Sequence, residues 1–225
     1  MARATPQVSF RTEVFPTDGY TSQAAALIQE AIPSSGTIVV TGGTTAARVY
    51  PELSMAADVL DIFFSDERCV PPDDDASNFK MASETFLSRS NSRVHRMRGE
   101  LGPDEAAADY HNKIAPFVAR GFDLMMLGMG ADCHVGALFP GSSALDETRF
   151  CAAVERPDGL QGLTLTPPAM KAARKILLLV TGAEKTDAVR RVVLGTEDVS
   201  ECPARLLADH PDVTFLLDEP AAAKT

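Results

Sequence analysis

Short apolar segments alternate with amphipathic ones along most of the chain. Five segments rich in β-branched and large apolar residues lack polar alternation, which indicates strands buried on both faces; they cover residues 37–40, 59–64, 122–127, 176–181 and 213–217. Five segments with helical spacing alternate with them, near residues 23–31, 45–53, 78–87, 105–114 and 184–194. An alternating edge strand is expected at 8–14 and another short strand at 163–166. This order predicts a three-layer α/β fold, whose mostly parallel sheet carries helices on both faces.

Composition narrows the class of protein. No linker or repeat divides the 225 residues, so we expect one domain over residues 1–225. A net charge of −10 disfavours nucleic acid and anionic lipid as partners, since both need clustered Lys and Arg. We expect no signal peptide and no membrane-spanning run, and the four cysteines form no C-x-x-C pair. We therefore expect a cytoplasmic monomer with reduced thiols.

Four of the buried segments run directly into a polar or glycine-rich stretch. These stretches are Thr41-Gly42-Gly43-Thr44-Thr45, Ser65-Asp66-Glu67-Arg68, Gly128-Met129-Gly130-Ala131-Asp132-Cys133-His134 and Thr181-Gly182-Ala183-Glu184-Lys185. Ligands of open parallel sheets bind in the crevice at the carboxyl ends of the strands. We expect all four stretches to share that crevice.

The glycine-rich stretches favour an anion site over a nucleotide site. Gly42 and Gly43 would let backbone N–H groups approach an anion at a helix start, although an ordinary tight turn is the alternative. No P-loop spacing is present, and Cys133 stands where a dinucleotide fingerprint has its third glycine. We expect no cofactor and no metal; Asp73-Asp74-Asp75 is expected to be solvated loop charge.

His134 is the candidate general base. An imidazole accepts protons near neutral pH, and Asp132, two residues earlier, would fix its tautomer and stabilise the imidazolium. The alternative is a structural histidine at the start of the next helix. Arg68 and Lys185 are candidate phosphate clamps, with a local salt bridge and a solvated lysine as the respective alternatives.

Taken together, these motifs resemble the 6-phosphogluconolactonase family, a branch of the group that includes glucosamine-6-phosphate isomerase. The match covers nearly the whole chain and includes the four stretches above, Ser77-Asn78, Leu138-Phe139-Pro140 and Thr164-Leu165-Thr166. The resemblance implies a modified Rossmann-like domain that hydrolyses 6-phospho-D-glucono-1,5-lactone to 6-phosphogluconate, the second step of the oxidative pentose phosphate pathway. It implies that His134 is the base and Asp132 its partner. Substrate contacts would come from Gly42, Gly43, Thr44, Asp66, Arg68, Gly128, Gly130 and Lys185.

Three departures from the family pattern bear on the site. Val135 and Gly136 replace the more usual Thr and Ala, so a hydroxyl at the helix start is lost. Cys133 replaces the usual Gly before the histidine and is strained if φ is positive there. The family often has Arg just before Thr-Leu-Thr; here Gln161-Gly162-Leu163 stands instead, so a phosphate contact is lost or comes from Arg156 or Lys171.

Two rival functions stay open. An amino-sugar-phosphate isomerase or deaminase of the same fold carries a Glu at the position of Phe139. A non-catalytic sugar-phosphate-binding domain is usually tied to a DNA-binding helix-turn-helix, for which the chain has no basic stretch.

Overall fold

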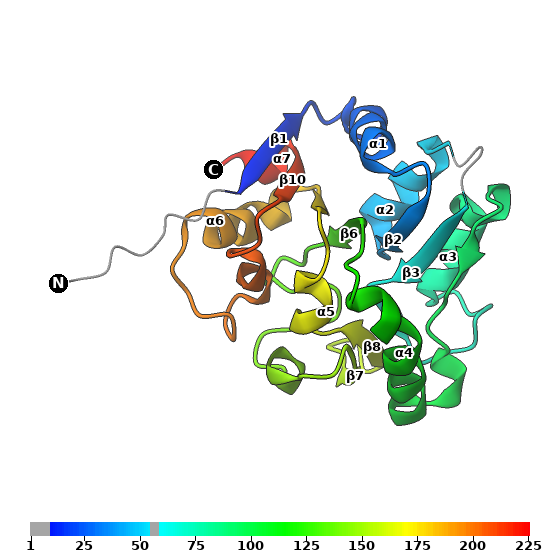
Figure 1. Ribbon diagram of the computed structural model, residues 1–225. Helices are drawn as coiled ribbons and strands as arrows, with labels where there is room; N and C mark the ends of the chain where they lie inside the picture. Colours follow the sequence, from blue (N-terminus) through cyan, green and yellow to red (C-terminus); the bar gives the residue numbers. More distant parts are fainter. Residues whose placement is uncertain (1–9, 55–58) are drawn as a thin grey trace.

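Seven parallel strands form the main sheet of the protein (Figure 1). The structure, a computed structural model, describes residues 10–54 and 59–225. The strands lie in the order β1 (Arg11–Phe15), β10 (Val213–Asp218), β9 (Ile176–Val180), β6 (Leu124–Gly128), β2 (Gly36–Val40), β3 (Leu60–Phe64) and β5 (Arg93–Val94). The five predicted buried strands are confirmed, and β1 lies at the edge, as predicted. Residues 8 and 9 of that edge-strand prediction lie outside the described residues.

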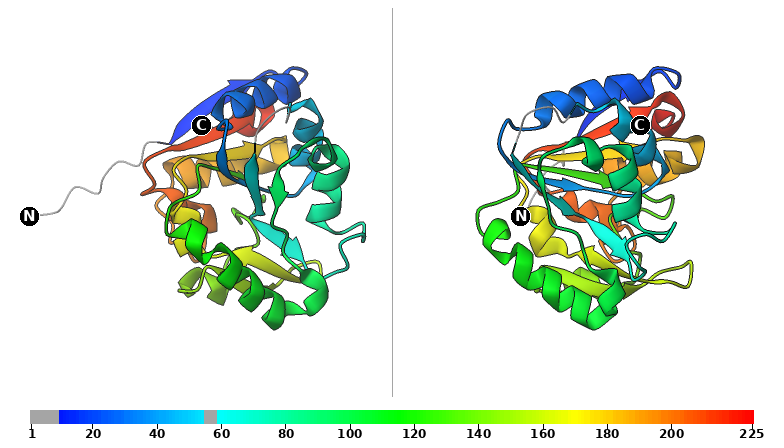
Figure 2. Two further views of the ribbon diagram at one scale, coloured as in Figure 1. Left: turned by 45° about the vertical axis from the view of Figure 1, so that its right-hand side comes forward. Right: turned by 90° about the vertical axis from the view of Figure 1, so that its right-hand side faces the viewer.

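Helices cover both faces of this sheet, which confirms the predicted three-layer class. In Figure 2, α1 lies on one side of the sheet and α4 on the other. The helices are α1 (Tyr20–Ala31), α2 (Thr44–Val49), α3 (Asn78–Thr85), α4 (Pro103–Val118), α5 (Pro167–Lys171), α6 (Thr186–Leu194) and α7 (Glu219–Ala222). Each predicted helix is present within a few residues of its expected bounds. In the described part of the chain, no helix is both long and apolar enough to cross a membrane.

A second, antiparallel sheet of three strands was not predicted. It has the order β4 (Asp66–Arg68), β8 (Gln161–Leu165) and β7 (Cys151–Glu155), and α4 packs against β7 and β8. Of its members only β8 was foreseen. The charged residues of β4 have low strand propensity, and the strand forms because β8 supplies its pairing partner.

Ser65 joins the two sheets. Its backbone N–H donates to the carbonyl of Val40 in the main sheet (2.8 Å), and its carbonyl accepts from Leu165 N–H in the second sheet (2.7 Å). The chain thus leaves β3 and enters β4 within one residue. This turn brings Asp66 and Arg68 to the carboxyl ends of the parallel strands.

The order of the main sheet places a crevice between β2 and β6. From β2 the chain builds outward through β3 and β5, and from β6 it builds the opposite way, through β9 and β10. β2 and β6 pair only through Ile38 with Leu124 and Val39 with Met125, so the last three residues of β6 extend beyond this pairing. Open α/β sheets bind ligands at such a switch point. The four strands that carry the predicted motifs, β9, β6, β2 and β3, are consecutive neighbours around it.

Candidate active site

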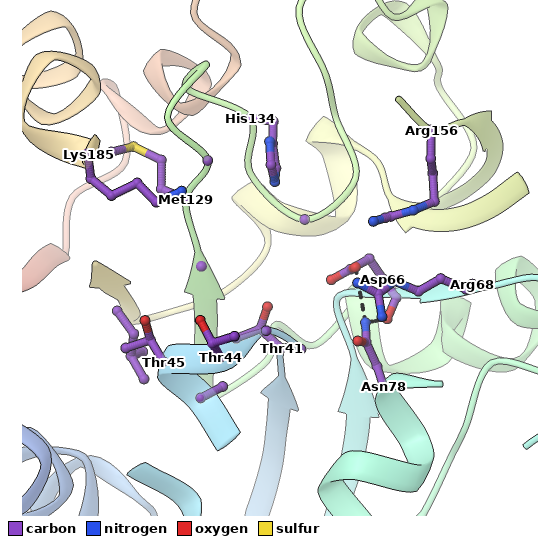
Figure 3. A pocket seen from close by; sticks show the side chains of 17 residues that line it. Thr41, Thr44, Thr45, Asp66, Arg68, Asn78, Met129, His134, Arg156 and Lys185 are labelled. Carbon is purple, nitrogen blue, oxygen red and sulfur yellow. Dashed lines mark hydrogen bonds between the residues drawn. The ribbon is translucent and has the colours of Figure 1, made fainter. Parts of the chain in front are cut away.

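One pocket at this crevice collects nine of the ten predicted site residues (Figure 3). The tenth, Asp132, is hydrogen-bonded to His134 and does not line the pocket. The cavity encloses about 180 Å³, less than the ~300–1,000 Å³ typical of drug-sized ligand pockets, so it suits a small ligand. Its lining is Thr41, Gly42, Gly43, Thr44, Thr45, Ala46, Asp66, Arg68, Asn78, Gly128, Met129, Gly130, His134, Gly136, Arg156, Leu179 and Lys185.

His134 and Asp132 form a close pair. Asp132 Oδ1 lies 2.7 Å from His134 Nδ1 and also accepts the His134 backbone N–H at 3.1 Å. Because a carboxylate accepts, Nδ1 carries the proton and Nε2 is left with its lone pair. Burial would raise the pKa of Asp132, but the hydrogen bonds from His134 outweigh it and lower the pKa to about 2. Asp132 is therefore ionised at neutral pH.

The loop after β6 is shaped around this pair. A Cβ at Gly130 would lie 2.1 Å from His134 Nδ1 and 2.3 Å from Asp132 Oδ1, so only glycine fits there. Cys133 has φ of 70°, in the left-handed region, so it carries the strain that was predicted for a positive φ at this position. Turns and isolated bridges follow, not a helix, so a helix-starting role for His134 is wrong.

Arg68 and Lys185 both reach the pocket without a carboxylate partner among the described residues. Arg68 Nη1 donates to the Ala76 carbonyl at 2.5 Å, while its buried Nε has no partner. The expected alternative, a salt bridge within the local acidic cluster, does not form. The helix predicted at 184–194 would place Lys185 in its first turn. This placement is wrong, because Lys185 ends a 3₁₀ turn and lies just before α6. Figure 3 shows the two cations on opposite sides of His134.

Asp66 and Glu67, the acidic residues before Arg68, accept hydrogen bonds that fix the backbone around the site. Glu67 is buried and accepts from the backbone N–H groups of Arg68, Asn78 and Phe79 and from the Ser77 hydroxyl, at 2.7–3.0 Å. Burial raises the pKa of Glu67 against these hydrogen bonds. Asn78 donates to Asp66 Oδ2 at 3.1 Å and to its carbonyl at 2.9 Å. The Ser77-Asn78 motif thus anchors the start of α3 to β4.

Several lining residues were not among the predicted contacts. Met129 and Gly136 flank the histidine loop, and Leu179 lies in β9, where only burial was predicted. Arg156 also enters the pocket, whereas Lys171, the other candidate for the missing arginine, lines a different hollow. The sequence could not choose between these two candidates, because Arg156 follows a strand that was not predicted.

Phe139 forms an apolar wall beside the imidazole. Its ring centroid lies 4.6 Å from that of His134. The position therefore offers no second proton-transferring group next to His134. Among the described residues, no cluster of three or more His, Cys, Asp or Glu side chains could hold a metal ion.

Comparison with known proteins agrees with this geometry. Residues 17–215 match the family described as glucosamine-6-phosphate isomerases/6-phosphogluconolactonase. The chain belongs to this family. The 6-phosphogluconolactonase of Mycobacterium tuberculosis is 35% identical, covering 96% of this chain and 99% of its own, and that of Synechocystis is 33% identical, covering 83% of each. The predicted family membership is confirmed.

Solved structures of the family share the fold. The 6-phosphogluconolactonase of Shewanella baltica is 26% identical with a TM-score of 0.82, covering 94% of this chain and 98% of its own. That of Trypanosoma brucei is 26% identical with a TM-score of 0.81, covering 96% and 98%. A glucosamine-6-phosphate deaminase at 21% identity has a TM-score of 0.83 and covers 96% and 100%, which shows the fold alone.

Proposed function

We propose that this protein hydrolyses 6-phospho-D-glucono-1,5-lactone to 6-phosphogluconate, with His134 as general base. The observation that carries the proposal is a single small pocket in which a carboxylate-backed imidazole lies between cationic groups. The lactonase relatives, which cover nearly the whole chain, support the same substrate. An overall negative chain that gathers Arg68, Arg156 and Lys185 in one pocket is suited to an anionic ligand.

The phosphate is assigned to the Lys185 side of the pocket. There Lys185, without an ion-pair partner among the described residues, faces the glycine loop and the Thr44 and Thr45 side chains (Figure 3). Backbone N–H groups of a glycine turn and an ammonium group together suit phosphate oxygens. The sugar ring then extends from this end towards His134.

At the other end, His134 activates water. As a water oxygen attacks the lactone carbonyl carbon, Nε2 takes its proton, and Asp132 stabilises the imidazolium formed. The tetrahedral intermediate collapses with cleavage of the bond between the carbonyl carbon and the ring oxygen. The imidazolium returns the proton to that ring oxygen, and the acid formed loses its own proton to solvent. A positioned base of this kind contributes roughly 10²–10⁴-fold.

Phe139 separates this reaction from the rival isomerase or deaminase chemistry. Ring opening of an amino sugar with proton transfer would use the acidic side chain that stands at this position in that branch. Here the group against His134 is a phenyl ring. We expect no release of ammonia from glucosamine 6-phosphate.

The direct test follows loss of freshly prepared lactone against a buffer blank, because the lactone also hydrolyses unaided. The native protein should exceed the blank, and His134→Ala should lose about 10²–10⁴-fold in turnover with its thermal melt preserved. His111→Ala is a suitable control, since His111 contacts the Phe150 backbone away from the pocket. Equal turnover of native protein and His134→Ala would remove His134 from the mechanism.

A further inference from the structure

Arg156 brings a second guanidinium group into the pocket. Its side chain is only 10% exposed, and Figure 3 shows it extending into the cavity on the same side of His134 as Arg68. Nε and Nη2 both donate to Asp158 Oδ2 at 3.1 Å, and the guanidinium lies 5.6 Å from the Phe139 ring centroid. Nη1 forms no hydrogen bond with the residues that the structure describes, so it remains available to a ligand.

Gly162 provides the space through which Arg156 passes. In the second sheet, Gly162 of β8 lies opposite Arg68 on one side and opposite Val154 on the other. Paired residues point to the same face, and Arg156 follows Val154 by two positions, so the two arginines share that face. A Cβ at Gly162 would lie 2.9 Å from Arg156 Cδ and 3.1 Å from the Glu67 carbonyl. A side chain at this position would therefore force Arg156 to shift.

Arg68 and Arg156 lie where the lactone carbonyl group, at the end of the substrate away from the phosphate, would bind. Lys185 lies on the far side of His134, where the phosphate is assigned (Figure 3). The water activated by His134 attacks the carbonyl carbon of the lactone. Negative charge then develops on the carbonyl oxygen, and the same carbon ends as the carboxylate of the product. Guanidinium groups bind planar carboxylates with parallel N–H donors. Arg68 lines the pocket on this side, and Arg156 offers its Nη1 there.

We propose that Arg156, admitted across Gly162, joins Arg68 to bind the developing oxyanion of the lactone and the carboxylate of the product. The inference rests on the proposed lactonase function. It makes Gly162 a specificity-determining position although glycine touches no ligand. It also gives the pocket two anion sites with different tasks: Lys185 binds the phosphate, and Arg68 and Arg156, which the sequence offered as phosphate contacts, bind the carboxylate.

Competitive inhibition by two ligands separates these tasks. 6-Phosphogluconate carries both phosphate and carboxylate, whereas glucitol 6-phosphate keeps the phosphate and lacks the carboxylate. Arg156→Ala should raise the inhibition constant of 6-phosphogluconate about tenfold or more, the loss of a charge-assisted hydrogen bond, and change that of glucitol 6-phosphate less than about twofold. Lys185→Ala should weaken both ligands.

Gly162→Ala tests the route across β8. It should weaken 6-phosphogluconate selectively, as Arg156→Ala does, and the double variant should be no worse than Arg156→Ala alone, because both changes remove the same contact. Arg149→Ala, which removes an exposed arginine just before β7, is the matched control and should leave both constants unchanged. Thermal melts identify any variant that fails to fold. If Arg156→Ala fails to fold, Arg156→Lys replaces it; this variant keeps the charge and should weaken 6-phosphogluconate selectively, but by a smaller factor.

The inference is overturned if Arg156→Ala weakens both inhibitors equally or neither, or if Gly162→Ala leaves 6-phosphogluconate binding intact. These outcomes differ from a failure of the proposed function, in which the native protein would not exceed the buffer blank with the lactone.

Discussion

Replacing Asp132 with Asn isolates the electrostatic part of the proposed base. The change keeps the shape of the side chain, and the amide oxygen can still accept the Nδ1–H of His134. It removes the negative charge 2.7 Å from the imidazole. The proton-accepting tautomer is therefore retained, while the imidazolium formed during attack loses its counter-charge.

The magnitude of this loss follows from the geometry. A pKa lowered from 3.8 to about 2 corresponds to roughly 2.4 kcal/mol at 1.36 kcal/mol per unit. Asp132 is 45% exposed, so water screens the interaction, and we expect the free energy of unfolding to fall by only about 1 kcal/mol. In the transition state, the attraction between the Asp132 carboxylate and the forming His134 imidazolium contributes in full to the activation free energy. The interaction energy of two such charges is ~1 kcal/mol in bulk water and ~4 kcal/mol near a protein surface. A value between these limits lowers kcat about 10–100-fold when the charge is removed.

The assay is initial-rate lactone hydrolysis, corrected for spontaneous opening. Because Asp132 does not line the pocket, KM should stay within about twofold while kcat falls. Asp198→Asn is the matched control: its Oδ1 accepts the N–H of Ser200, two residues later, just as Asp132 accepts that of His134, but no imidazole lies beside it. A kcat for Asp132→Asn within twofold of native, or an equal fall for Asp198→Asn, would refute the electrostatic role.

Two further predictions concern the frame around the site. Tyr50 Oη accepts from Thr41 N–H and donates to the Thr41 carbonyl, each at 2.9 Å and fully buried, so Tyr50→Phe should cost about 1–3 kcal/mol in urea unfolding; an unchanged midpoint would contradict this. Hydrogen bonds from Arg93, opposed by burial and aided by His95, lower the pKa of Asp61 to about 2. This stability, about 2 kcal/mol, is present above pH 4 and lost as pH falls towards 2, so Asp61→Asn should be less stable than native at pH 7 and equal to it near pH 2. A difference in stability between Asp61→Asn and native protein that persists at pH 2 would contradict this prediction.

The main sheet and four parts of the site were predictable because their signals are local. Each buried strand is a short apolar run, and the stretch that follows it in sequence also follows it in space. Parallel pairing then brings the carboxyl ends of β9, β6, β2 and β3 to one edge, whatever the details of packing. Even the strain at Cys133 followed from a single missing glycine.

The second sheet could not be predicted in the same way. β4 is only three residues long and consists of Asp66, Glu67 and Arg68, which read as loop. Its partner β8 lies about a hundred residues later, and the pairing depends on Ser65 bonding to both sheets. The burial of Glu67, with four donors around its carboxylate, is likewise a product of tertiary contacts.

Gly162 shows why comparing a sequence with its family position by position misjudges such a site. Aligned to the family pattern, the glycine is a lost arginine. In three dimensions, Arg156 occupies the space that a side chain at position 162 would fill. The pairing of β7 with β8 brings these two residues together, although no linear motif connects them. On this argument the arginine at the pocket and the glycine beneath it are one feature. Restoring an arginine at position 162 alone, by Gly162→Arg, should therefore displace Arg156 rather than add a third guanidinium group. The variant should bind 6-phosphogluconate no more tightly than native, and a gain in affinity would show that the two positions act independently.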